Sequence, residues 1–341
     1  MSTVTLFYRN QAHSDEVKVM LEELQAEIPF SLVVIDVMKD DVLRDIYQDI
    51  VPIVRAGPFQ LKYPFTKQEL VVMIHSANDR ETHLEAVGDS KFKKRKERGS
   101  KISNTDRVTG WFSKNYMGLV IAILLIYVGL PFLAPVLMHS GAIKSANVIY
   151  KMYSVLCHQM AFRSWFLYGY QAAYPSELVH VDNLDSYEMI TGQTGIRNQN
   201  EFNIDQYILQ ARNFAGNEIV GYKVALCERD IAMYGSMLMF GIIFTVNGRK
   251  IKPLSWKIWI LIGLLPIALD GISQLPGFLQ WMNGNIPFRE STPLIRTITG
   301  TLFGITTGWY LFPVIEETML ETRRLLTWKY ARVDQVGTVK D

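Results

Sequence analysis

Residues 116–138, YMGLVIAILLIYVGLPFLAPVLM, form an uncharged and almost wholly apolar stretch in a chain of 341 residues. A helix of about 20 apolar residues crosses the roughly 30 Å hydrocarbon core of a bilayer. We therefore expect a membrane-spanning helix here. Residues 231–246, 254–272 and 294–315 are apolar stretches of similar character. Together the four stretches predict an all-α transmembrane helical bundle of about four spans.

Positive charges orient these spans. Basic residues gather at 91–101, at 249–252 and near the C-terminus, between Arg323 and Arg332. Loops on the cytoplasmic side of a membrane are enriched in Lys and Arg. Four spans place all three clusters in the cytoplasm. We therefore expect a multi-pass protein of the cell membrane with both termini in the cytoplasm.

Residues 145–168 are a further partly apolar segment. If this segment also crossed, the basic cluster at 249–252 would be exported, against the charge rule. We therefore expect the segment to be interfacial or re-entrant, with Lys144, Lys151 and His158 on its polar side. Its expected apolar stripe consists of Val148, Met152, Val155, Phe162 and Phe166.

Composition divides the chain into parts. We expect a soluble α/β domain at 1–78, a basic juxtamembrane linker at 79–112, the bundle at 113–320 with an external loop at 169–222, and a cytoplasmic tail at 321–341. The basic run at 91–101 should attract anionic lipid of the bilayer, although a merely solvated tether has the same composition. The net charge of +2, with its basic residues bunched, predicts no nucleic-acid partner.

The first domain alternates β-prone and helical stretches. Strands are expected at 4–8, 31–37 and 51–54, helices at 14–26, 40–47 and 66–74, and a turn at 57–58. This order predicts a small domain with a mixed sheet. No basic and apolar leader precedes the first strand, so we expect no cleavable signal peptide.

Four stretches of this domain, VTLFYRN at 4–10, DEVKVMLEEL at 15–24, VVIDV at 33–37 and VPIV at 51–54, resemble the glutaredoxin-like thioredoxin fold. In that family a Cys-x-x-Cys pair opens the first helix, where the helix N-terminus stabilises a thiolate. Here residues 11–14 read Gln-Ala-His-Ser, so the resemblance implies a redox-inactive domain. Pro52 matches the family's cis-proline. The resemblance implies a module that docks a protein partner, or a structural appendage.

Short motifs recur in the membrane part. They are CHQ at 157–159 with Arg163 and Ser164, CERD at 227–230 with Tyr234 and Gly235, Asp270–Gly271 with Gln274, and Arg296 with Thr299 and Gly300. Together they resemble a prokaryotic family of predicted membrane proteins of unknown function, DUF2085. Many of its members have a second cysteine at the position of Asp230. The resemblance implies no activity.

In the four-span arrangement these motifs meet at the external face. His158, Asp230 and Asp270 are the candidate catalytic residues, since His158 titrates near neutrality. The candidate substrate-binding residues are Arg163, Arg229, Gln274 and Arg296. An unpaired ionisable group within a span costs about 3 kcal/mol, so Arg229, Arg289 or Arg296 should pair with Asp270. Buried pairing without any function explains the same residues.

The chain has only two cysteines, Cys157 and Cys227, which excludes a disulfide-rich scaffold. Cys227, Asp230 and Tyr234 should line one stripe of a helix, where Cys157 could meet them. The two thiols could form a disulfide, bind a metal with His158 and Asp230, or simply pack. Adjacent residues on a helix diverge by about 100°, which counts against Cys157 and His158 sharing one ion. Cofactors and metals are otherwise left open.

Three functions remain open from the sequence. The first is an accessory, scaffold or binding subunit whose redox-inactive domain docks a partner. The second is a membrane-embedded enzyme that acts on a lipid or another anionic substrate at the external site, and the third is a small transporter. The glycines at 300, 304 and 308 form a small-residue stripe that lets a helix approach closely, either within the bundle or from a second subunit. The oligomeric state is not predicted.

Overall fold

The structure is a computed structural model that describes residues 2–39, 43–44, 47–179, 181–193, 204–275 and 289–338. The expected helix at 40–47 lies mostly outside these residues. The chain forms two compact units. The first contains residues 1–115 and 317–341, and the second contains residues 116–316.

The first unit is built on a mixed four-stranded sheet. Its strands are β1 (Ser2–Tyr8), β2 (Phe30–Asp36), β3 (Ile53–Ala56) and β4 (Phe59–Lys62), and their order across the sheet is β2-β1-β3-β4. β1 is parallel to β2 and antiparallel to β3, and β3 and β4 form an antiparallel hairpin. A parallel pair needs a long crossover connection, which α1 (Ala12–Glu27) supplies.

Apolar side chains of α1 and α3 (Lys67–Ala86) form a core with the sheet. Leu21 and Leu70 are fully buried there beside Leu6. A capping box between Thr66 and Glu69 fixes the start of α3. The helix continues well past the expected end at residue 74, because no Gly or Pro interrupts the sequence before Gly88.

The predicted linker and tail are largely helical. Residues 79–112 contain the end of α3, the helix α4 (Ser90–Gly99) and the start of α5 (Asn104–His139). The tail is the continuation of α13 (Pro293–Thr338), in which Trp328 and Ala331 pack against a second small core of the sheet that contains Phe7 and Ile35. An apolar sheet face must be covered, and this helix covers it within the first unit.

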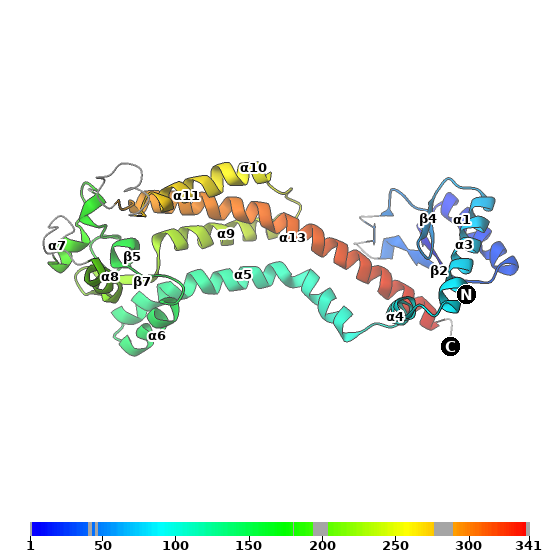
Figure 1. The fold of residues 1–341 in the computed structure, drawn as a ribbon, viewed down its shortest axis with the longest axis horizontal. Helices are drawn as coiled ribbons and strands as arrows, with labels where there is room; N and C mark the ends of the chain where they lie inside the picture. The colour runs from blue at the N-terminus through cyan, green and yellow to red at the C-terminus, as the bar shows by residue number, and fades with distance from the viewer. Residues whose placement is uncertain are drawn as a thin grey trace. The chain divides into compact units, whose positions relative to one another are not determined.

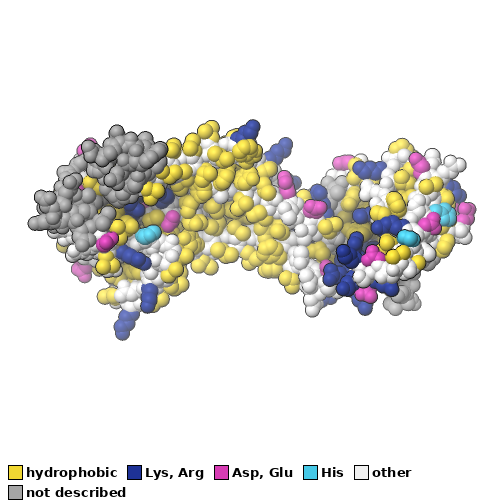
Figure 2. Space-filling model, viewed as in Figure 1, with side chains coloured by type: hydrophobic (Ala, Val, Ile, Leu, Met, Phe, Trp, Pro, Cys, Tyr) yellow, Lys and Arg dark blue, Asp and Glu magenta, His cyan; other side chains and the backbone are white. Residues whose placement is uncertain are grey.

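Among the described residues, three helices are long and apolar enough to cross a membrane: α5, α9 (Glu228–Val246) and α13. The fourth expected span, at 254–272, is helical but divided into α10 (Trp256–Ile258), a π-helical segment (Trp259–Leu264) and α11 (Leu265–Ile272). The π-helical segment ends just before Pro266, which has no backbone N–H to donate. Figure 1 shows these elements side by side, and Figure 2 shows hydrophobic side chains over most of their visible face.

The glycine stripe of α13 packs on α9. A side chain at residue 300 would meet the carbonyl oxygen of Arg229 and the methyl group of Ala232, and one at residue 304 would collide with the Met233 carbonyl oxygen. At residue 308 it would press on the Phe240 ring. The small residues therefore serve a contact within this bundle.

The second unit is not wholly helical, which corrects the prediction of an all-α bundle. Its cap, residues 143–227, contains α6 (Ile143–Tyr153), α7 (Tyr187–Thr191), α8 (Ile204–Asn213) and a three-stranded antiparallel sheet. The strands are β5 (Ser164–Leu167), β6 (Gly216–Asn217) and β7 (Gly221–Cys227), in the order β5-β7-β6. The expected external loop therefore belongs to a folded cap with an aromatic core of Phe162, Phe166, Tyr174, Tyr187 and Tyr207.

Residues 145–168 do not form a membrane-spanning helix. They begin in α6 and end in strand β5. The predicted single apolar stripe divides: Val148, Met152 and Val155 are exposed, whereas Phe162 and Phe166 are buried in the cap. The helical spacing stops at Tyr153, so residues beyond it cannot share the helix's face.

Candidate functional site

Several of the residues singled out by sequence lie where the cap meets the helices, and a buried ion-pair network joins Arg163 and Arg296 to two glutamates. Arg163 donates from Nε and Nη2 to the two carboxylate oxygens of Glu290, at 2.8 and 2.6 Å. Arg296 forms ion pairs with Glu290 and, at 3.4 Å, with Glu228. Its Nη1 also donates to the Phe162 carbonyl oxygen in the cap. Two arginines and two glutamates therefore neutralise each other at the start of α9 and α13.

A second set of contacts surrounds Asp270, in the last turn of α11. Arg229 pairs with one carboxylate oxygen, and the Ser291 hydroxyl donates to the other. Arg289 lies 3.7 Å from Asp270 and also contacts Ser273. The expected pairing of Asp270 is thus made by Arg229 and Arg289, while Arg296 pairs elsewhere.

The charged side chains of the network are buried, and each has a direct partner. Glu228 is fully buried, and Asp270, Glu290 and Arg296 are each at most 6% exposed. A cavity of about 440 Å³ lies nearby, between Trp165, Val181, Leu184 and Leu294, but its described lining has no charged side chain. Because each of these charges is buried beside a partner of opposite sign, the network has the chemistry of a buried ion-pair cluster.

A separate cluster consists of Cys157, Cys227 and Asp230. The two sulfur atoms and a carboxylate oxygen all lie within 4.8 Å of one another. Both cysteines are free thiols. The expected disulfide therefore remains a prediction, and the expected meeting of Cys157 with the start of α9 is present.

Local structure explains why these three residues meet. Cys227 ends β7 and is the N-cap of α9, and Asp230 stands in the first turn of that helix. Cys157 lies shortly after α6, whose Tyr150 hydroxyl donates to the Lys223 carbonyl oxygen of β7. The two thiols share a hydrogen bond, which lowers the pKa of Cys157 and raises that of Cys227.

Two predicted site residues do not join either cluster. His158 is exposed and makes no hydrogen bond or ion pair with the part of the chain that the structure describes. Gln274 donates to the backbone carbonyl oxygen of Asp270. Sequence reasoning missed Glu228, Glu290 and Ser291. The two glutamates could have been predicted from the sequence, since each lies next to an apolar stretch and arginines were expected at the same site.

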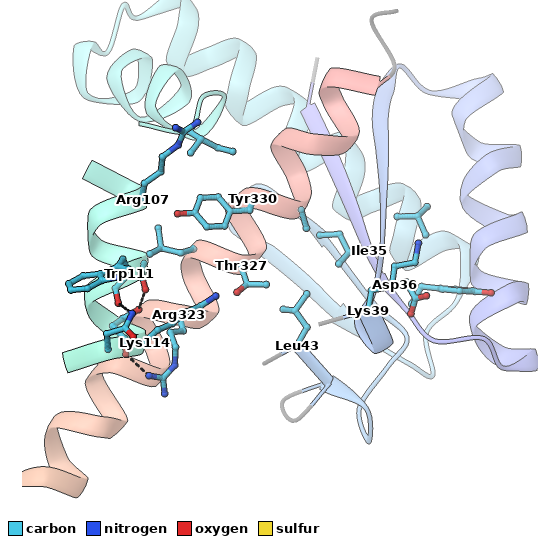
Figure 3. A pocket seen from close by; sticks show the side chains of 18 residues that line it. Ile35, Asp36, Lys39, Leu43, Arg107, Trp111, Lys114, Arg323, Thr327 and Tyr330 are labelled. Carbon is cyan, nitrogen blue, oxygen red and sulfur yellow. Dashed lines mark hydrogen bonds between the residues drawn. The ribbon is translucent and has the colours of Figure 1, made fainter. Parts of the chain in front are cut away.

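The first unit holds the larger cavity, of about 990 Å³ (Figure 3). It lies between the β1 and β2 strands and the helices α5 and α13 of this unit. Cationic lining residues are Lys39, Arg107, Lys114 and Arg323, and the lining also includes Asp36, Trp111 and Tyr330. The Arg323 guanidinium donates to the Ser113 carbonyl oxygen, which holds the two helices together at this wall.

Pro52 and residues 11–14 are expected to correspond to the redox site of the glutaredoxin-like family, and the structure shows the contacts they make. The Val51–Pro52 peptide bond is cis, and Pro52 is buried. At the start of α1, the His13 ring stacks on Tyr63 with 4.9 Å between ring centroids. Pro52 does not line the described cavity. The cavity and the predicted proline groove are therefore different places.

Comparisons with known proteins agree with the membrane character of the second unit. Residues 210–310 match the model of a family of predicted membrane proteins, DUF2085. An uncharacterized protein of Methanocaldococcus jannaschii is 25% identical over 213 residues, which cover 60% of this chain and 94% of that protein. No solved structure matches the chain significantly. The matched range includes Cys227, Asp230, Asp270 and Arg296, whereas Cys157 and Arg163 lie before it, so the chain is similar, over residues 210–310, to predicted membrane proteins of unknown function.

Proposed function

We propose that this protein is an accessory or scaffold subunit of the membrane, whose first unit docks a protein partner and whose ion-pair network fixes the cap to the helices. The observation that carries the proposal is the network itself. Its four arginines, two glutamates and Asp270 are paired with each other. Such a network specifies one arrangement of elements, which is what a scaffold requires.

The enzyme alternative has weaker support. A general acid or base must reach the proton that it transfers. The exposed His158 and the buried, ion-paired Asp270 line neither of the two described cavities. A transporter would need a polar path, whereas the charges here are neutralised in place.

The topology of the first unit supports our interpretation of it as a thioredoxin-like domain. A sheet of order β2-β1-β3-β4, with one parallel pair and helices α1 and α3 against one core, is the topology expected of that fold. The thiolate-bearing pair of a redox domain is replaced by Gln11-Ala12-His13-Ser14. A fold kept without its nucleophile favours a role in binding.

Four spans also remain our proposal. The divided helix at 256–272 lies along α13: Trp259 donates to Thr307, and its ring stacks on Tyr310. Its far end reaches the start of α9 through the Asp270–Arg229 pair. These contacts support a course alongside α9, and we propose that the divided helix crosses the membrane with it. With four spans, the positive-inside rule favours both termini in the cytoplasm.

The cavity of the first unit is the proposed docking place. It combines cations, aromatic rings and the sheet edge near Lys39, which suits an acidic segment of a partner protein. A photo-crosslinking side chain at Thr327, inside the cavity, should capture one discrete partner in cells. The same side chain at Lys18, an exposed residue of α1 outside the lining, should not.

A second experiment, on the purified protein, tests the enzyme alternative. Purified protein should carry no specific small molecule that an Asp270→Asn variant of equal stability releases. If mass spectrometry finds a lipid or metabolite bound in the wild type and absent from that variant, while Thr327 captures no protein, the scaffold proposal fails.

A further inference from the structure

We propose that Cys157, Cys227 and Asp230 bind a zinc-like divalent metal ion and that this ion ties the cap to the first turn of α9. The proposal does not depend on the scaffold role. It rests on three potential ligands that come from two separate segments and converge at one point.

The geometry is close to that of a bound site. Zinc binds sulfur at about 2.3 Å and carboxylate oxygen at about 2.0 Å, so ligand atoms on one tetrahedral ion lie roughly 3.5–3.8 Å apart. The three atoms here lie within 4.8 Å of one another. The separations therefore exceed those of a bound set by about 1 Å at most. The Cys227–Asp230 spacing helps, because residues three apart share a helix face.

The ligand types select the metal. Thiolates favour zinc and other borderline or soft ions over magnesium and calcium, and the carboxylate is an ordinary third zinc ligand. Three protein ligands leave one position of a tetrahedron for water or another small ligand. His158 is exposed beside Cys157 and is not part of the ligand set.

Two features of the surroundings favour negative charge at this point. The thiol of Cys227 stands at the N-cap of α9, where the helix dipole favours an anion. Arg163 is close enough to act electrostatically on both thiols. Two thiolates, one carboxylate and a divalent ion leave one negative charge, which this environment offsets.

The experiment uses the full chain, purified in detergent with reductant and without chelator, then exposed to zinc and freed of excess. Elemental mass spectrometry should find about one zinc per chain. Cys157→Ala, Cys227→Ala and Asp230→Ala should each lose the ion, with affinity falling by more than the roughly 10–100-fold typical of an outer-shell change. The matched control, His158→Ala, should keep it.

Cobalt binding gives a second readout. It is measured on the wild type, so it remains informative if a variant fails to fold. Wild-type protein titrated with cobalt should develop the thiolate-to-cobalt charge-transfer band, and zinc should displace it. Asp230→Cys should retain the ion and strengthen that band, since it adds a third thiolate. If reduced wild type shows neither the band nor bound zinc, or if Asp230→Ala binds as much zinc as wild type, the site is wrong. Thiols found linked to each other in the isolated protein, and still unable to bind zinc after reduction, would establish a disulfide pair instead.

Discussion

Arg163 of the cap and Glu290, just ahead of α13, are joined by two parallel hydrogen bonds of 2.8 and 2.6 Å. The side chain of Glu290 is 1% exposed, so its charge depends on this partner and on Arg296. Residues 127 positions apart are thereby locked together at the boundary between cap and helices.

Replacement of Arg163 by Met should destabilise the protein by about 3 kcal/mol, because it leaves a buried carboxylate with one partner fewer. Arg163→Lys should lose less, since it keeps the charge and loses the two-pronged geometry. Thermal unfolding of the purified protein measures both. Lys144→Met, at an exposed residue of α6, is the control, and an equal loss there would contradict a specific role for the pair.

Gly304→Ala should separate α9 from α13, because the new methyl group would collide with the Met233 carbonyl oxygen and the Ser236 hydroxyl. Overpacking of this kind costs about 1–3 kcal/mol. Gly129→Ala in α5 adds the same methyl group where nothing lies within 4 Å, and it should leave stability unchanged or slightly raised. Thermal unfolding of the two variants compares them directly, and equal behaviour would show that helix propensity alone is being measured.

Lys223 should make the cap more stable at alkaline pH. Burial lowers the pKa of its amine from 10.5 to about 7, and the amine donates to the carbonyl oxygens of Gln159 and Arg212. Between pH 7 and 10.5 the unfolded state binds more protons than the folded state, so stability rises with pH in this window. Below pH 7 both states are protonated and this contribution is constant.

Unfolding followed at a series of pH values should therefore show a steeper rise above neutrality in the wild type than in Lys223→Met. Cys157 and Arg212 also act electrostatically on Lys223, and both remain in the variant, so the difference reports the lysine itself. Identical slopes would mean that the amine stays protonated in the fold.

Trp328 should protect the sheet of the first unit. Its ring packs on the core that contains Phe7 and Ile35, and the Arg55 guanidinium lies over it at 4.9 Å. Trp328→Ala should lower local stability by about 2–3 kcal/mol, which is less than for a fully buried aromatic residue. Amide hydrogen exchange in β1 and β2 measures the effect. Trp256→Ala, at a 56% exposed tryptophan, should leave that exchange as it is.

The apolar helices and the strand and helix order of the first domain follow from the sequence, because hydrophobic period and span length are local properties. The meeting of Cys157, Cys227 and Asp230 was also within reach, since the spacing of 227 and 230 is helical. The sequence did not predict that the fourth expected span is divided into short helical segments. Pro266 interrupts the backbone hydrogen bonding there, whereas the apolar composition is the same as that of a continuous span. The apolar stripe of 145–168 failed beyond Tyr153, where a helix gives way to a strand.

The sequence by itself determined that this is a membrane protein with a region of strands and helices in its N-terminal part, and that this region lacks a dithiol. Only the tertiary structure decided which arginine pairs with which acid, that residues 143–227 fold into a cap with its own sheet, and that the end of α13 covers the sheet of the first unit. The physical reason is the separation along the chain of the residues that interact. Apolar patterns are read within one helix or strand, whereas ion pairs such as Arg163–Glu290 join distant residues whose partners are chosen by packing and burial.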